Sequence, residues 1–153
     1  MKDKSFSGAV KNIMKLTLPS LSVNEGVARI IAAAFCAQLD PAAPEIADVK
    51  CAVSEAVTNC IVHAYRECVG NIYITLRALD GNAVRIDIRD RGCGIEDVER
   101  AREPLFTTDA AGERSGMGFT VMESFMDKVR VSSKAGQGTT VTMYKKFAGR
   151  SDT

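Results

Sequence analysis

Residues 54–64, SEAVTNCIVHA, constrain the fold of this chain more than any other segment. As a helix, this stretch places Glu55 and Asn59 four residues apart, one above the other on the same face. The opposite face is an apolar stripe that can pack on a sheet. Its members are Ile46, Val53, Val57, Cys60 and Ala64. A carboxylate and a carboxamide on one polar face are by themselves typical of a solvated helix, so the interpretation depends on motifs further along the chain.

Size and composition favour one globular domain. The chain has 153 residues, of which 46% are hydrophobic and 25% are charged, enough for a single core. The 20 basic residues are balanced by 19 acidic ones, so direct binding to nucleic acid is not expected. No apolar run is long enough for a membrane span, and no secretory signal is recognisable. The five cysteines include no C-x-x-C pair, which favours a reducing, cytoplasmic location.

Secondary-structure signals predict one α/β domain, numbered 1–153, with an ordered core of about residues 13–147. No repeat or linker divides it. The predicted elements are an edge strand 13–18, helices from 22 and from 44 to about 67, strands 71–79 and 83–90, a short helix near 95–102, a helix 116–126, and strands 128–133 and 139–146. Ser22 and Glu25 have the spacing of a capping box at the start of the first helix. The apolar stripe of that helix is predicted to contain Val27, Ile30, Ile31, Ala34, Phe35 and Leu39, with Arg29 on the far side.

Asp90, Gly92 and Gly94 follow a predicted strand. One interpretation is that the Asp90 carboxylate accepts a hydrogen bond from an adenine amino group, while the glycines let the backbone approach the base. The alternative is an ordinary turn after a strand, where Asp and Gly are common. The third glycine of a dinucleotide-binding fingerprint is missing.

Ser115, Gly116, Met117 and Gly118 open a predicted helix. Free N–H groups and the positive end of a helix dipole suit phosphate binding, and glycine removes side chains that would block the approach. A glycine-rich loop without a ligand is the alternative, and these residues alone leave both open. The chain has no P-loop motif and no protein-kinase signature.

Other polar side chains fit a magnesium nucleotide. Asn59 offers a carbonyl oxygen, which suits Mg²⁺, and Glu55 could orient or deprotonate an attacking hydroxyl. Thr107 and Thr108 lie in a polar connection that suits a mobile lid. Arg114 has the donors to contact a γ-phosphate or a partner carboxylate. Each of these side chains has an alternative role as an ordinary solvated residue.

Together, the motifs resemble those of the GHKL ATPases, the superfamily of gyrase and the histidine kinases. The four boxes occur in the family's order: E-x-x-x-N at 55–59, D-x-G-x-G at 90–94, G-x-G at 116–118 and GT at 138–139. The segments SEAVTN, IRDRGCGI, PLFTT and ERSGMGFTVME resemble more closely the serine-kinase anti-sigma factors of spore-forming bacteria. This resemblance covers about residues 16–146.

The resemblance implies a two-layer α/β sandwich of the Bergerat type, with helices on one face of a mixed, mostly antiparallel sheet. It also implies ATP and Mg²⁺ as cofactors, bound between the helix of Glu55 and the lid. In the family's roles, Asn59 holds Mg²⁺, Glu55 is the catalytic base, and Asp90 reads adenine. Thr139 assists at the base through water. The remaining implied nucleotide contacts are Gly92, Gly94, Thr107, Thr108, Arg114, Ser115, Gly116, Met117 and Gly118.

The resemblance further implies a homodimer that inhibits a sporulation sigma factor of the sigma-F type. As a kinase it would phosphorylate a serine of an anti-anti-sigma protein with a STAS domain. Arg29 and Arg114 are candidates for partner contact. The alternatives are an ATP-binding anti-sigma module without kinase activity and an anti-sigma kinase of a stress response. A detached histidine-kinase domain would need a phospho-acceptor helix pair, and His63, the only histidine, lies within the predicted nucleotide-binding helix.

Overall fold

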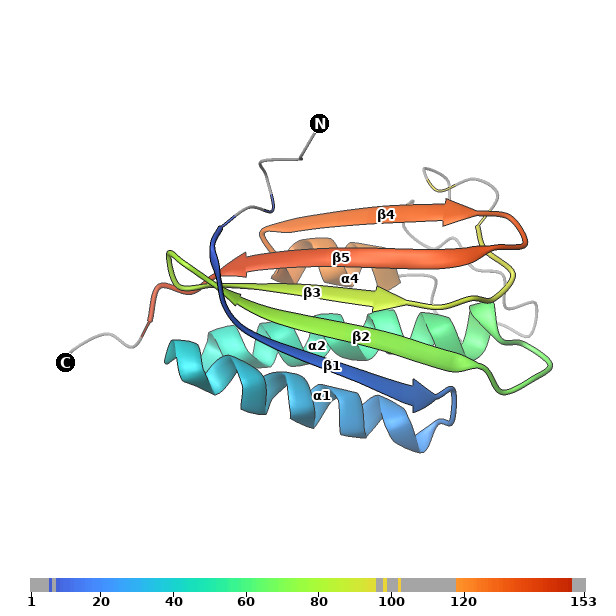
Figure 1. The fold of residues 1–153 in the computed structure, drawn as a ribbon, viewed down its shortest axis with the longest axis horizontal. Helices are drawn as coiled ribbons and strands as arrows, with labels where there is room; N and C mark the ends of the chain where they lie inside the picture. Colours follow the sequence, from blue (N-terminus) through green and yellow to red (C-terminus); the bar gives the residue numbers. More distant parts are fainter. Residues whose placement is uncertain (1–5, 7, 96–97, 99–101, 103–117, 150–153) are drawn as a thin grey trace.

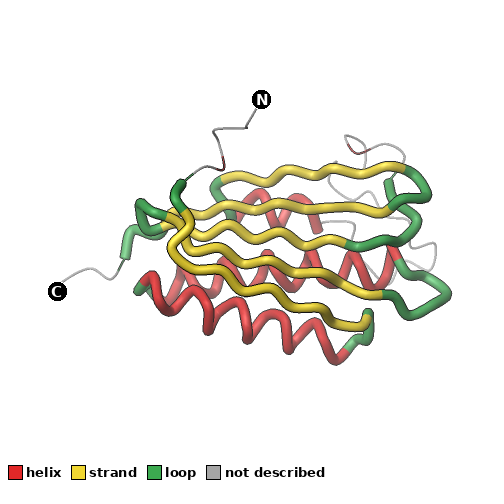
Figure 2. Tube along the Cα trace, in the orientation of Figure 1, coloured by secondary structure: helices red, strands yellow, loops and turns green. Residues whose placement is uncertain are grey.

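The computed structural model describes residues 6, 8–95, 98, 102 and 118–149. Helices cover one face of a five-stranded sheet, and the other face is open (Figures 1 and 2). The strand order is β1-β2-β3-β5-β4, and all four neighbouring pairs are antiparallel. The expected two-layer α/β sandwich is therefore confirmed, and its described strands contain no parallel pair. In the same part of the chain, no helix has both the length and the apolar character needed to cross a membrane.

The described elements follow the predicted order, and the short helix predicted near 95–102 lies mostly outside the described residues. The elements are β1 (Val10–Pro19), α1 (Val23–Cys36), η2 (Ala37–Leu39), α2 (Ala43–Asn59), η3 (Cys60–Ala64), β2 (Asn71–Leu79), β3 (Ala83–Arg89), α4 (Gly118–Phe125), β4 (Lys128–Lys134) and β5 (Gly138–Lys146). The β2–β3 hairpin turns at Gly81 and Asn82, with φ of 79° and 61°, a conformation that Gly and Asn adopt readily. The helix of α2 and η3 ends at Ala64, a few residues before the predicted end.

Helix α1 begins where it was predicted, but the capping box is absent. Ser22 has helical φ and ψ and makes no side-chain cap hydrogen bond, because a capping residue needs extended dihedrals to reach the first free N–H groups. The Glu25 carboxylate instead accepts a hydrogen bond from the hydroxyl of Ser54 on α2, and it lies 3.6 Å from the Arg29 guanidinium. Glu25 therefore joins the two helices.

The predicted apolar stripe of α1 was partly wrong. Phe35 and Leu39 are buried as expected, whereas Val27 is 37% exposed and Ile30 is 63% exposed. The small side chains of Ala28, Ala32 and Cys36 form the buried face with them. Because these residues are small, α1 can pack closely against its neighbours, and its larger aliphatic side chains are left at the surface.

Helix α2 packs its apolar face on the sheet as predicted. Val53 and Val57 are fully buried and belong to the same core cluster as Ile86 and Ile88 of β3. Burying each valine side chain contributes about 1.5–3 kcal/mol to folding. The polar face, with Glu55 and Asn59, remains half-buried. The core therefore fixes which way this polar face points.

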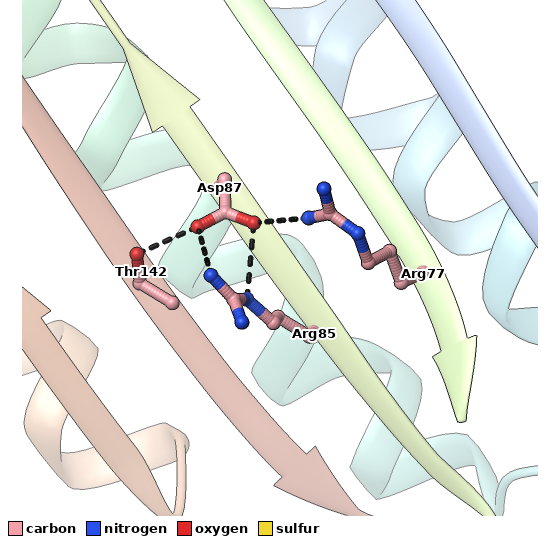
Figure 3. Close-up of polar contacts among 4 residues, drawn as sticks. All are labelled: Arg77, Arg85, Asp87 and Thr142. Carbon is pink, nitrogen blue, oxygen red and sulfur yellow. Dashed lines mark hydrogen bonds and ion pairs between the residues drawn. The ribbon is translucent and has the colours of Figure 1, made fainter. Parts of the chain in front are cut away.

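The open face of the sheet carries a polar network around Asp87 (Figure 3). Its carboxylate accepts hydrogen bonds from Arg77 at 2.6 Å, from Arg85 at 3.1 and 3.3 Å, and from the Thr142 hydroxyl at 2.6 Å. Arg77 and Arg85 are directly opposite each other in the β2–β3 register, where two like charges would repel. Asp87 neutralises this repulsion and ties three strands together on the side away from the helices.

Candidate functional site

The first residue of α4 lies against the polar face of α2. A Cβ added at Gly118 would lie 3.2 Å from Asn59 Oδ1 and 3.4 Å from Glu55 Oε2. Three predicted site residues from two motifs are thus brought together. Because residue 118 has no side chain, the carboxylate and the carboxamide are not crowded at this point.

The hydrogen-bond pattern of the helix changes directly after Asn59. Cys60–Ala64 form a π-helical turn, in which the Tyr65 N–H donates to the Cys60 carbonyl at 3.1 Å. Such turns are rare and occur frequently at functional sites. The carbonyl of Ala64 then accepts the Cys93 N–H at 3.2 Å. The end of the helix is therefore attached to the loop that follows β3.

Glycine at position 92 permits this attachment. A Cβ there would lie 2.3 Å from the Ala64 carbonyl oxygen, closer than any side chain tolerates. Gly94 has a φ of 73°, and its Cβ would lie 2.1 Å from the Lys134 carbonyl oxygen. Both glycines thus have a packing role against protein backbone. This packing role differs from the predicted one, in which the two glycines allow close approach of a base.

Asp90 is buried at the end of β3, with 5% of its surface exposed. Its Oδ1 accepts the N–H of Gly92 at 2.9 Å and of Thr139 at 3.2 Å. Its Oδ2 lies 3.7 Å from Cys60 Sγ. Burial raises the pKa of Asp90, while the two N–H groups and the thiol favour the charged form and oppose the rise. A buried acceptor of this kind suits recognition of a hydrogen-bond donor.

Thr139 is held beside Asp90 by a residue that no motif marked. The Thr139 and Ser133 hydroxyl oxygens are 2.8 Å apart. Ser133 Oγ also accepts the Ile95 N–H at 2.8 Å and donates to the Gly138 carbonyl at 3.0 Å. Tyr65 was missed as well: its hydroxyl accepts the Arg91 N–H and donates to the Asn71 carbonyl, both at 2.7 Å. No sequence signal distinguishes these residues from ordinary strand and loop positions.

A hollow of about 400 Å³ opens beside Glu55. Its lining residues are Arg29, Ala47, Lys50, Cys51, Ser54, Glu55 and Val121. Arg29, predicted to project away from the core, is 43% exposed in its side chain, lines this hollow and lies next to Glu25. The basic side chain of Arg29 and the carboxylate of Glu55 therefore face the same space. Ser54, which bonds Glu25, was not singled out from the sequence.

Several predicted site residues lie outside the described part of the chain. They are Thr107, Thr108, Arg114, Ser115, Gly116 and Met117. Five of the described members group into two neighbouring sets. Glu55, Asn59 and Gly118 form one set, and Asp90 and Thr139 form the other, with Cys60 between them.

A helical layer on one face of an antiparallel sheet, with these two sets at one end of α2, defines an ATPase domain of the histidine-kinase type. Residues 18–145 match the family model described as "Histidine kinase-like ATPase domain". An anti-sigma F factor of Caldanaerobacter subterraneus is 56% identical over 139 residues, which cover 91% of this chain and 96% of that protein. The anti-sigma F factor of Bacillus subtilis is 51% identical over 137 residues, covering 89% and 93%. The chain belongs to the histidine kinase-like ATPase family and, within it, to the anti-sigma F factors.

Solved structures share the fold. The RsbU and RsbW domains of Rv1364c from Mycobacterium tuberculosis superpose with a TM-score of 0.67 at 21% identity, covering 94% of this chain and 35% of that one. Full-length ShkA in complex with AMPPNP gives a TM-score of 0.57 at 19% identity, covering 95% and 32%. The chain thus spans about a third of each solved chain, and the likeness concerns the fold alone.

Proposed function

We propose that this chain is an ATP-dependent protein serine kinase that also binds and inhibits a sigma factor of the sigma-F type. The kinase substrate is a serine of an anti-anti-sigma protein with a STAS domain. Membership of the anti-sigma F factors supports the choice of partners. The observation that carries the kinase assignment is the meeting of Glu55, Asn59 and Gly118 at the start of α4.

The residues at this meeting point suit a magnesium nucleotide. Asn59 Oδ1 is a hard oxygen ligand of the kind that Mg²⁺ takes, and Gly118 leaves open the space that a Cβ would fill. Within the described residues no group of three or more His, Cys, Asp or Glu side chains could hold a metal. We assign Asn59 as the protein ligand because its side-chain oxygen lies at this meeting point. When bound, Mg²⁺ neutralises phosphate charge during transfer.

Each remaining residue has one task in the proposed reaction. Glu55 accepts the proton of the serine hydroxyl. The serine of the substrate approaches Glu55 through the adjoining hollow. The Asp90 carboxylate accepts a hydrogen bond from the adenine amino group, and Thr139 supports the base through water. Arg114 contacts the γ-phosphate. The other assigned nucleotide contacts are Gly92, Gly94, Thr107, Thr108, Ser115, Gly116, Met117 and Gly118.

Partner binding is assigned to Arg29 and Arg114. Arg29 borders the hollow beside Glu55, so a protein that contacts Arg29 also comes close to the proposed catalytic base. This placement supports a common docking area for the sigma factor and the antagonist. Arg114 is the second candidate for contact.

We further propose a cytoplasmic homodimer. Large apolar side chains are exposed on β1, on α1 and in the link between them: Val10, Ile13, Met14, Leu21, Val23, Val27 and Ile30. A surface of this kind is typical of a protein interface. The five cysteines are free thiols, which is in keeping with a reducing compartment.

Incubation with γ-labelled ATP, Mg²⁺ and the antagonist protein tests the kinase assignment. We expect label on a serine of the antagonist, and we expect Glu55→Gln to reduce transfer at least about 100-fold, the usual scale for a lost general base. ATP binding by Glu55→Gln should be unchanged. The control Glu67→Gln alters an exposed carboxylate in the loop before β2 and should transfer normally.

Two outcomes would reject parts of this function. Sigma-factor binding with ATP bound but without any transfer would identify the chain as a non-catalytic anti-sigma module. Capture of a stress-response sigma factor in preference to a sigma-F type factor, in a binding assay with purified sigma factors, would reject the sporulation assignment.

A further inference from the structure

The two oxygens of Asp90 have different surroundings. Oδ1 accepts two backbone N–H groups, from Gly92 and Thr139. Oδ2 lies 3.7 Å from the thiol of Cys60, a normal distance for a hydrogen bond to sulfur. Cys60 is 3% exposed and Asp90 is 5% exposed. This buried contact joins the helix of Glu55 and Asn59 to the residue proposed to read the base.

A thiol leaves this oxygen able to bind a ligand. A carboxylate oxygen has two acceptor positions, and the single S–H of Cys60 occupies one of them. Since S–H is a weak donor, the bond orients the carboxylate without removing its charge. A cysteine thiol is normally protonated at neutral pH, so Cys60 can donate to Oδ2 across the 3.7 Å contact.

We propose that Cys60 is a positioning residue for purine recognition, because its thiol orients Oδ2 of Asp90 to accept the amino group at position 6 of adenine. The inference rests on the proposed ATP binding. It also specifies the ligand chemistry: a purine with a donor at position 6 is preferred. A 6-oxo purine would place an acceptor against an acceptor.

The competing explanation is that Cys60 only fills space in the core, where a buried cysteine behaves as a small hydrophobic residue. In that case its replacement changes stability but affects all purine nucleotides alike. The two explanations therefore differ in one measurable quantity, the coupling between residue 60 and the 6-amino group of the ligand.

The experiment measures binding of ATP and of purine riboside triphosphate, which lacks the 6-amino group, by calorimetry with Mg²⁺ on the full chain. Cys60→Val removes the donor and keeps a similar volume. We expect it to weaken ATP binding about three- to tenfold, the scale of one weak hydrogen bond, and to leave the analogue unaffected. Cys60→Ser keeps a donor and should bind ATP within about threefold of the original protein.

A matched control is Cys36→Val on α1. The Cys36 thiol is fully buried, and burial raises its pKa to about 12. Its replacement should change the affinity for neither nucleotide. If Cys60→Val does not fold, as judged by circular dichroism, Cys60→Ala makes the same comparison with a smaller side chain.

Equal weakening of both nucleotides, unchanged ATP binding in a folded donorless variant, or failure of Cys60→Ser to retain binding would each overturn the role of Cys60. These results are distinguishable from failure of the proposed function. In that case the original protein itself would bind neither ATP nor the analogue.

Discussion

Asp90 and Thr139 are joined by two hydrogen bonds. The Asp90 N–H donates to the Thr139 carbonyl at 2.9 Å, and the Thr139 N–H donates to Asp90 Oδ1 at 3.2 Å. The pair fastens the end of β3 to the start of β5 and holds a carboxylate out of water. A buried charge of this kind opposes folding unless its partners compensate for the lost hydration.

Asp90→Asn should stabilise the ligand-free protein. Because burial raises the pKa of Asp90, the folded state binds its proton more tightly than the unfolded state. This contribution to stability is fully present below the ordinary Asp pKa and is lost as the pH rises through the raised value. At pH 7 the uncharged Asn, which can still accept both N–H groups, should increase the free energy of unfolding by about 1 kcal/mol. Urea titrations at pH 7 measure the stabilisation by Asn, and titrations at acidic pH measure the pH-dependent contribution of Asp90. A variant that is less stable than the original protein at pH 7 would contradict the prediction.

Asn59→Ala should weaken ATP binding more in the presence of Mg²⁺ than in its absence. Loss of its carbonyl oxygen should weaken ATP binding in the presence of Mg²⁺ at least about tenfold, with a smaller change in EDTA. Calorimetry under both conditions provides the measurement. The control Asn71→Ala changes an exposed asparagine at the start of β2 and should bind normally; wild-type affinity in Asn59→Ala would remove Asn59 from the metal site.

Gly118→Ala should reduce activity without loss of stability. The added methyl group would meet the side-chain ends of Asn59 and Glu55 at 3.2–3.4 Å, and these flexible ends can shift slightly. Alanine is also favoured over glycine in a helix by about 1 kcal/mol. We therefore expect unchanged or higher thermal stability and about tenfold slower phosphate transfer, as for displaced catalytic groups. Normal transfer by this variant would show that the start of α4 is not part of the catalytic site.

Gly92→Ala, in contrast to Gly118→Ala, should lower the stability of the protein. Its Cβ would lie 2.3 Å from the Ala64 carbonyl oxygen, which is backbone and cannot move aside. We expect a loss of about 3 kcal/mol in the free energy of unfolding, measured by urea titration. Gly26→Ala in α1, where the added Cβ would be 3.9 Å from its nearest neighbour, Arg29, is the matched control and should be neutral or stabilising. Equal stability of the two variants would argue against the contact between the helix end and the loop.

Ile30→Asp should produce a folded monomer. Ile30 is 63% exposed on α1, so a charge there costs little within one chain but opposes burial at an interface. Sedimentation should show half the original mass. Val69→Asp, at an equally exposed position (63%) before β2, should remain dimeric; a dimeric Ile30→Asp would place the interface elsewhere.

Local signals were sufficient to predict most of the fold. The alternation in β2 gave its bounds of 71–79, and the turn residues Gly81 and Asn82 marked the hairpin because they tolerate positive φ. The spacing of Glu55 and Asn59 predicted a shared polar face. The motif order predicted that this face, Gly118 and Asp90 belong to one site. In the structure, Gly118 lies against Asn59 and Glu55, and Asp90 contacts Cys60, the residue after Asn59; that they form one nucleotide site stays a prediction.

Contacts between elements that are distant in the sequence could not be predicted in the same way. Helix α1 has two apolar faces, one with Val27 and Ile30 and another with Ala28 and Ala32, and periodicity alone does not tell which one faces the core. The larger side chains of Val27 and Ile30 predict one buried face, whereas the structure buries the face of Ala28 and Ala32. The capping box failed for a related reason: the Glu25 carboxylate bonds Ser54 on a different helix, and a local motif carries no information about that partner.

Asn59 and Cys60 are consecutive residues at the junction of α2 and its π-helical turn. The proposed metal ligand is therefore next in sequence to the thiol that contacts the proposed base-reading residue, Asp90, at the end of β3. We expect a shift of this turn relative to the loop after β3 to alter the metal contact and the adenine contact of a bound nucleotide together.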